Sequence, residues 1–329
     1  MKPRISTNRI GIISFKSTSH CGVMFDGQEI MCQIAKNVKI DGERNATKKQ
    51  NTFTGRGLEN QIVVGDRVSV MFDSSDVAII TERFSRDNQI SRRSSSTRVG
   101  GQLIEQVLVS NIDQVIAVMA AANPEPKWNL LDRYLVMAEG ADLPVSILIT
   151  KTDLVEMGEP LNGLRQRLAV YQEIGYQVFM TSCLQLSGIP SAFDMLRNKT
   201  SIMIGKSGVG KTSLVNALIP GREDRVKAVN EITGKGRHTT TSMRLIPIDQ
   251  KTMLIDSPGT REFGLWDVDP DDLDWFFPEM RPYLNQCKFK LDCRHEDEPG
   301  CAVRKAVVNQ QIDPQRYHSY LRLKEDFLS

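Results

Sequence analysis

The chain of 329 residues lacks any apolar run close to the roughly 18 residues that a membrane-spanning helix requires, so no transmembrane segment is expected. Its N-terminal stretch, MKPRISTNRIG, has no apolar core of the kind that secretory signals contain, which favours a cytoplasmic protein. The six cysteines do not have the distribution of a disulfide framework, and the chain shows no internal repeat. A length of 329 residues exceeds the usual size of one domain, and two or three domains are therefore expected.

The net charge of +2 is distributed unevenly along the chain. Residues 1–100 contain 16 Lys+Arg and 10 Asp+Glu, whereas the rest of the chain is acidic overall. A basic N-terminal part favours a polyanionic partner such as nucleic acid, although an ordinary solvated surface would show the same composition.

Short strand-like segments dominate the first 83 residues. Asp26-Gly27 is a typical hairpin turn, and the segments are RIGIISF, CGVMFDG, EIMCQIA, DRVSVMF and DVAIITERF. Five short strands without a convincing helix predict a small β-barrel of the OB-fold type. The segment that follows, residues 83–101, is rich in serine and arginine and is typical of a basic linker.

Strands and helices alternate from about residue 107 onward. The apolar runs QVIAVMAA, PVSILIT, QVFMTS and SIMIG are separated by helical stretches such as NLLDRYLVMAEG and LNGLRQRLAVYQEIG. This alternation predicts a parallel sheet with helices on both faces. After about residue 267 there is no clear strand, and the tail is acidic, then rich in cysteine and histidine, then helical. We therefore expect three domains, at residues 1–95, 102–266 and 267–329.

The stretch GKSGVGKT matches the phosphate-loop pattern G-x-x-x-x-G-K-[ST], with an apolar strand before it and a helical stretch after it. Glycines in such a loop let backbone N–H groups surround phosphates at the N-terminus of the helix. The ammonium group of Lys211 is expected to reach the β- and γ-phosphates, and the hydroxyl of Thr212 is expected to ligate Mg²⁺. The predicted phosphate-binding residues are Gly205, Lys206, Ser207, Gly208, Val209, Gly210, Lys211, Thr212 and Ser213.

The loop TKTD follows the apolar run VSILIT, at the edge of a parallel sheet where ligands bind. The carboxylate of Asp153 can accept hydrogen bonds from the N1–H and the exocyclic amine of guanine, and adenine offers neither in that arrangement. The K-x-D pattern alone would also fit an ordinary surface loop. A second loop, TSC, ends another apolar run and is expected to lie beside the first. The predicted guanine-contacting residues are Thr150, Lys151, Thr152, Asp153, Thr181, Ser182 and Cys183.

The segments LIDSPG and GRHTTT supply groups that could sense a γ-phosphate. Asp256 is placed to hold Mg²⁺ through water, Gly259 can offer its N–H to the γ-phosphate, and Thr240 is the candidate switch threonine. Thr260 stands where many switch GTPases have a glutamine that orients the attacking water. His238 is therefore the candidate for that catalytic role, the alternative being a solvent-exposed loop histidine.

The order of these motifs is base loop, second base loop, phosphate loop, switch threonines and D-x-x-G. An ordinary guanine-nucleotide switch begins with the phosphate loop. Joining the two termini of such a domain and opening its chain at another point produces the order seen here. The sheet need not change, because domain termini usually lie close together. The sequence therefore predicts a circularly permuted GTPase domain over residues 102–266.

Three of the six cysteines crowd into one short stretch, CKFKLDCRHEDEPGC, with a histidine among them. Three thiolates and one imidazole suit a closed tetrahedral Zn²⁺ site of the structural kind. Free thiols beside a surface histidine are the alternative. The predicted zinc ligands are Cys287, Cys293, His295 and Cys301.

The predicted protein is a multi-domain α/β chain with an N-terminal OB-fold β-barrel, a circularly permuted P-loop GTPase domain and a C-terminal zinc-binding helical domain. It resembles the RsgA (YjeQ) family of ribosome-associated GTPases over essentially its whole length, through SGVGKTSLVNAL, GRHTTT, DSPGTREFGL and CRHEDEPGCAVRKAV. The resemblance implies hydrolysis of GTP to GDP in late maturation of the small (30S) ribosomal subunit. It also implies stimulation by that subunit and contact of the barrel with 16S rRNA.

The sequence departs from the family pattern in two places. The base loop usually begins with asparagine, and here it begins with Thr150, which lacks an amide. The gap between Cys287 and Cys293 is one residue longer than the family pattern implies.

Two other functions fit the sequence. One is a nucleotide-gated RNA-binding factor whose hydrolysis is incidental, which hydrolysis assays with and without small subunits would separate. The other is a P-loop ATPase or kinase with a zinc module, which nucleotide preference would separate because Asp153 predicts GTP and GDP over ATP. The expected cofactors are one structural Zn²⁺ and Mg²⁺ with GTP, and the expected state is a monomer without a membrane partner.

Overall fold

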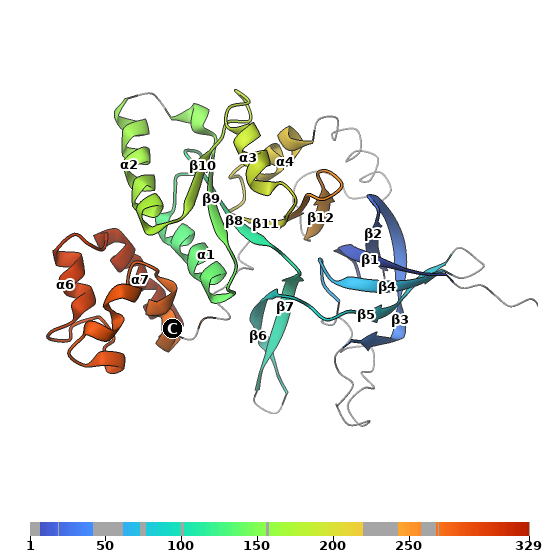
Figure 1. Ribbon diagram of the computed structural model, residues 1–329, viewed down its shortest axis with the longest axis horizontal. Coiled ribbons are helices and arrows are strands. Elements are labelled where there is room, and N and C mark those ends of the chain that lie inside the picture. Colours follow the sequence, from blue (N-terminus) through green and yellow to red (C-terminus); the bar gives the residue numbers. More distant parts are fainter. Residues whose placement is uncertain are drawn as a thin grey trace, which may run out of the picture.

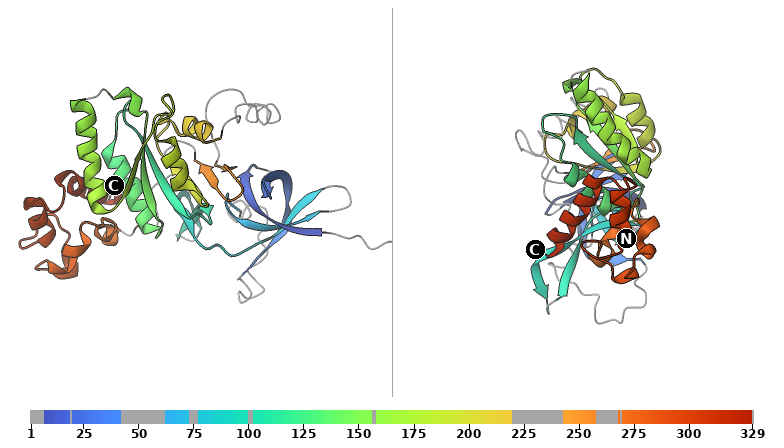
Figure 2. Two further views of the ribbon diagram at one scale, coloured as in Figure 1. Left: turned by 45° about the horizontal axis from the view of Figure 1, so that its top comes forward. Right: turned by 90° about the vertical axis from the view of Figure 1, so that its left-hand side faces the viewer.

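The computed structural model describes residues 7–18, 20–41, 62–72, 77–99, 102–155, 158–219, 243–257, 268 and 270–328. Figure 1 and Figure 2 show a barrel, an α/β part and a small helical part, with the α/β part between the other two. Within these residues, no helix combines the length and the apolar character needed to cross a membrane.

Five strands close into a barrel in the N-terminal part of the chain. Strand β1 pairs with β2 and β4, β2 also pairs with β3, and β5 pairs with both β3 and β4. The core of the barrel includes Ile13, Val23, Val68 and Ile80, which are fully buried. This closed arrangement confirms the predicted OB-type barrel. The strands are β1 (Thr7–Lys16), β2 (His20–Phe25), β3 (Gln28–Ile40), β4 (Arg67–Phe72) and β5 (Ala78–Arg83).

The segment expected to be a linker is largely a strand. Strand β6 (Gln89–Val99) pairs with β7 (Gln102–Ser110) in an antiparallel hairpin, which Figure 1 shows projecting from the junction of the barrel and the α/β part. Ile90 and Val109 face each other in register and are buried. The linker prediction was wrong because the serine- and arginine-rich sequence has little apolar periodicity, whereas the strand forms by backbone pairing with β7.

The α/β part contains a sheet in the order β10-β9-β8-β11-β13-β12, in which only β12 and β13 pair antiparallel. Along β9, Ile147 and Ile149 pack in the core under α1 and α2, while Leu148 packs in the core under α3 and α4. The alternation confirms a sheet covered on both faces. The strands are β8 (Gln114–Ala120), β9 (Val145–Thr150), β10 (Gln177–Met180), β11 (Thr200–Ile204), β12 (Arg244–Pro247) and β13 (Met253–Asp256). The helices are α1 (Trp128–Gly140), α2 (Glu159–Ile174), α3 (Ile189–Leu196) and α4 (Lys211–Leu218).

The C-terminal part packs against α1 and α2, and its described residues, 270–328, contain no strand. The guanidinium of Arg316 is fully buried and lies 2.6 Å from Asp132 Oδ1 and 2.7 Å from Glu279 Oε1. The hydroxyl of Tyr171 donates to the same Asp132 oxygen at 2.8 Å. A buried ion cluster therefore fixes this part on the α/β part. Its elements are η3 (Pro270–Phe276), η4 (Arg281–Gln286), η5 (Lys290–Asp292), α6 (Ala302–Val308) and α7 (Pro314–Leu328).

Candidate functional site

The predicted phosphate loop connects the end of β11 to the start of α4. Gly208 and Gly210 have φ angles of 82° and 95°, a left-handed conformation that glycine adopts without strain. At Gly205, a Cβ atom would lie 2.4 Å from the carbonyl oxygen of Val118, so only glycine fits there. The buried Lys211 Nζ donates to the Gly205 carbonyl oxygen at 2.6 Å, and burial lowers the pKa of Lys211 although the nearby Asp256 opposes that shift. The loop thus has the strand–turn–helix geometry that phosphate binding requires.

The two predicted base loops lie side by side, because they follow the neighbouring parallel strands β9 and β10. The backbone N–H of Thr152 donates to the Thr181 carbonyl oxygen at 3.2 Å. The hydroxyl of Ser182 donates to Asp153 Oδ1, and it accepts from the backbone N–H of Gln185 at 3.1 Å. The short helix η2 (Thr152–Leu154) holds the aspartate. The Asp153 carboxylate is thereby oriented by a neighbouring loop through its Oδ1 atom.

The first base loop also contacts the phosphate loop directly. The hydroxyl of Thr150 donates to the Val209 carbonyl oxygen, and Lys151 Nζ donates to the Gly208 carbonyl oxygen at 2.7 Å. Lys151 Nζ also donates to the Asn123 carbonyl oxygen, in the connection between β8 and α1. Lys151 itself has a φ angle of 55°, an uncommon conformation that places its side chain between these two carbonyls. Base loop and phosphate loop therefore form one connected site.

The structure brings together most of the predicted nucleotide-site residues. The β11–β13 register pairs Met203 with Asp256, which places this aspartate at the strand end next to the phosphate loop. The predicted residues His238, Thr240 and Gly259 lie outside the described residues. Asn123 was not predicted as part of this site, because it contributes a backbone carbonyl that any residue would supply and so carries no sequence signal.

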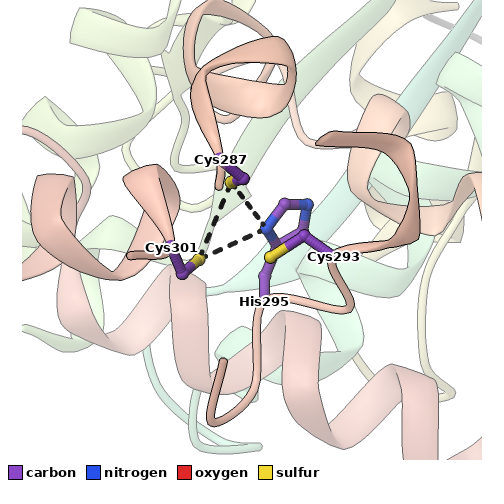
Figure 3. Close-up of side chains that lie close together, drawn as sticks. All are labelled: Cys287, Cys293, His295 and Cys301. Carbon is purple, nitrogen blue, oxygen red and sulfur yellow. Dashed lines mark hydrogen bonds between the residues drawn. The ribbon is translucent and has the colours of Figure 1, made fainter. Parts of the chain in front are cut away.

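The predicted metal ligands also meet in one place (Figure 3). One ligand atom from each of the four residues lies within 4.8 Å of the others, and all four residues are buried. Figure 3 shows the imidazole of His295 facing the sulfur atoms, with its Nδ1 at 3.6 Å from Cys287 Sγ and 3.4 Å from Cys301 Sγ. Cys287 is part of the cluster despite its longer spacing, so three sulfurs and one nitrogen form a closed set that fits Zn²⁺. The cluster consists of Cys287, Cys293, His295 and Cys301.

Neighbouring groups orient this cluster and affect its ionisation. The outer nitrogen of the histidine, His295 Nε2, lies 2.9 Å from Asp274 Oδ2 on η3. Burial raises the pKa of the Cys293 thiol to about 12 and also raises that of Cys301. Burial also acts to raise the pKa of the Cys287 thiol, but hydrogen bonds from backbone N–H groups oppose it, and this pKa is lowered. A divalent cation would offset the cost of keeping three buried thiolates together, which is the usual electrostatic reason for such a cluster.

Comparisons with known proteins agree with this geometry. The RsgA GTPase family matches residues 83–266. The chain is 41% identical to the small ribosomal subunit biogenesis GTPase RsgA of Marinobacter nauticus over 81% of this chain and 74% of that protein. It is 35% identical to the protein of the same name from Bacteroides fragilis (strain ATCC 25285), over 92% of this chain and 91% of that protein.

Two solved structures resemble the whole chain. The crystal structure of YjeQ from Thermotoga maritima matches with a TM-score of 0.73 and 28% identity, over 98% of this chain and 99% of the other. The structure of YloQ, described as a circularly permuted GTPase, matches with a TM-score of 0.65 and 25% identity, over 97% and 95% of the two chains. With the joined base and phosphate loops and the permuted order of strands, these matches establish that the chain is a circularly permuted GTPase of the RsgA family.

Proposed function

We propose that this GTPase acts in late maturation of the small ribosomal subunit, and that the subunit stimulates its hydrolysis of GTP to GDP. The observation that carries the proposal is the contact between Asp153 and Ser182 beside a formed phosphate loop, an arrangement that suits guanine and phosphates together. The curated relatives named above are described as small ribosomal subunit biogenesis GTPases, which supports the choice of partner.

Each group of the site has a chemical role in this proposal. Asp153 accepts from the N1–H and amine of guanine, and the phosphate loop surrounds the phosphates with backbone N–H groups. Lys211, now bonded to the Gly205 carbonyl, would turn to the β- and γ-phosphates when these replace that partner. Thr212 and Asp256 would hold Mg²⁺, which neutralises charge that develops on the phosphates.

Activation of water is assigned to His238, with Thr240 and Gly259 contacting Mg²⁺ and the γ-phosphate. This assignment rests on the sequence, since all three lie outside the described residues. A neutral imidazole can hydrogen-bond a water, and its reference pKa of about 6.5 leaves it mostly neutral at cellular pH. Stimulation by the subunit then corresponds to bringing this histidine into place.

The barrel is proposed to bind 16S rRNA. Arg9 of β1 and Lys36 and Lys39 of β3 are exposed on its strands, within the part of the chain that carries the excess of basic residues. Cationic side chains on an OB-type barrel are suited to an RNA backbone. The zinc cluster has a structural role in this proposal, and the protein acts as a cytoplasmic monomer.

The experiment that tests the proposal measures GTP hydrolysis by the purified protein with and without purified small subunits, beside ATP as a control nucleotide. We expect slow hydrolysis of GTP alone, a large increase with small subunits, and no increase with large subunits. Hydrolysis that does not respond to small subunits would favour the RNA-binding factor with incidental hydrolysis. Equal use of ATP would favour the P-loop ATPase.

A further inference from the structure

Thr150 lies at the C-terminal end of β9, between the base loop and the phosphate loop. Its side chain is buried, with 2% of the residue exposed. Its backbone is fixed by the ladder with β8, where it pairs with Ala120 and accepts from the Ala121 N–H at 2.8 Å. The side chain therefore has a defined direction, toward the phosphate loop. A Cβ atom at Gly210 would lie 3.5 Å from the Thr150 hydroxyl oxygen, which shows how closely the loop approaches.

The partners of the Thr150 hydroxyl determine what it can do. Its oxygen contacts the carbonyl oxygen of Val209, and it lies 3.4 Å from the carbonyl oxygen of Met119. Both partners are acceptors, so the hydroxyl must be the donor in either contact. A hydroxyl has one hydrogen to donate, and here that hydrogen is used within the protein.

The edge of guanine that carries N7 offers a donor two acceptors, the ring nitrogen N7 and the carbonyl oxygen O6. An asparagine, the usual residue at this position, has two N–H donors and could serve both the loop and the base. Thr150 has one, and the bond to Val209 uses it. Guanine recognition therefore falls on Asp153, which its partner Ser182 orients.

We propose that Thr150 is a positioning residue, whose hydroxyl holds the phosphate loop through the Val209 carbonyl and does not contact N7 of the guanine base. The adjacent Lys151 holds the preceding carbonyl, that of Gly208, at 2.7 Å. Two consecutive residues of the base loop thus fix two consecutive carbonyls, which holds the phosphate loop in the conformation that binds phosphates. The inference rests on the nucleotide site assigned under the proposed function.

The test compares two variants of the full-length protein with two nucleotides. Thr150→Val removes the hydroxyl and keeps the shape, whereas Thr150→Ser keeps the hydroxyl and removes the methyl group. GDP is compared with 7-deaza-GDP, in which a C–H group replaces N7. Affinities are measured by calorimetry, and the thermal unfolding midpoint of each nucleotide-free variant serves as the folding control.

We expect Thr150→Val to weaken GDP and 7-deaza-GDP by the same factor, about 5- to 30-fold, since a buried carbonyl loses its donor. Thr150→Ser should bind both within about two-fold of wild type, because the donor remains. A loss that affects GDP but not 7-deaza-GDP would mean that the hydroxyl contacts N7, and it would overturn the inference. The inference would also be overturned if Thr150→Val bound GDP with unchanged affinity, or if Thr150→Ser weakened binding as much as Thr150→Val. Failure of the wild type to bind either nucleotide would instead reject the nucleotide site itself.

Discussion

Arg244 of β12 is paired in the sheet with Phe15 of β1, and through this pair the sheet of the α/β part continues into the barrel. On its other side, Arg244 is in register with Asp256, the proposed Mg²⁺ residue of β13. Its guanidinium lies 5.1 Å from the centre of the Phe15 ring and 2.7 Å from Glu29 Oε2 on β3. One arginine thus connects the barrel to the strand that ends at the nucleotide site.

The first prediction concerns this joint. Because the Glu29–Arg244 pair is only partly exposed, we expect Glu29→Ala and Arg244→Ala to show a coupling free energy of about 1 kcal/mol. Urea unfolding of wild type, both single variants and the double variant measures it. The exposed pair of Arg197 and Asp194 provides the matched control cycle, with a coupling of about 0.5 kcal/mol or less. Strict additivity at Glu29 and Arg244 would contradict a specific joint.

The second prediction concerns the buried cluster around Arg316. Arg316→Ala leaves Asp132 and Glu279 buried without their cation, and we expect it to lower the free energy of unfolding by about 3–5 kcal/mol. Lys324→Ala on the same helix is the control, because its partner Glu296 is about half exposed, so the loss should be well below that of Arg316→Ala. Urea unfolding checks both. Similar small losses for the two variants would show that the buried cluster contributes little to docking.

The sequence predicts elements whose signal is local. The alternating apolar residues of β9 and the glycines of the phosphate loop specify a buried strand and a turn through neighbours in the chain. Residues 89–99 have no such signal, because β6 depends on pairing with β7, and their composition alone therefore predicted a linker. The pairing of Arg316 with Asp132, 184 residues apart, could not be predicted either, since a buried ion pair depends on how two domains pack.

For the candidate site, the sequence identifies residue types but not their partners. Lys151 and Asp153 follow from a short motif at a strand end. That Thr150 bonds to Val209, 59 residues away, follows only from the approach of two loops at the same sheet edge. The four residues of the cysteine–histidine cluster were predictable because they lie in one short stretch, whereas Asp274, which contacts His295, carries no such signal.

The third prediction concerns metal binding. Asp274→Asn keeps a hydrogen-bond acceptor near His295 Nε2 but removes its charge, and we expect zinc affinity to fall about 10- to 100-fold. Competition with a chromogenic chelator measures this, and Asp272→Asn, at an exposed position of the same helix, is the control. Cys301→Ser should release the metal and destabilise the C-terminal part while the GTPase part stays folded. Freshly purified wild type without zinc by elemental analysis would refute the site.

The fourth prediction concerns His238. If this histidine orients the attacking water, His238→Ala should reduce subunit-stimulated hydrolysis by roughly ten-fold or more, since loss of a positioned general base typically costs about 100-fold at the low end. GTP affinity should change little, because the interaction forms with the water and not with the bound nucleotide. Single-turnover hydrolysis with small subunits, measured beside nucleotide affinity, tests both points. Unchanged hydrolysis would exclude the role, and a large loss of affinity would reassign His238 to binding.

The fifth prediction concerns base specificity. In the wild type, Ser182 donates to one oxygen of Asp153, so the other oxygen can accept from guanine. In Asp153→Asn, the amide oxygen can keep the Ser182 bond while its N–H₂ group faces the base, opposite the guanine amine, which is also a donor. Xanthine carries a carbonyl there and restores the pairing, so we expect the preference for GDP over XDP to fall by about 100-fold or more.

Competition binding of GDP and XDP to the wild type and two variants measures this change. Ser182→Ala is the matched control, because it removes the group that orients Asp153 but leaves the carboxylate in place. It should weaken both nucleotides by about 5-fold, the value of one hydrogen bond, without inverting their order. An Asp153→Asn protein that retains the full preference for GDP would show that another residue reads the base. A Ser182→Ala protein that prefers XDP would show that the hydroxyl itself takes part in the reading, rather than acting through the Asp153 carboxylate.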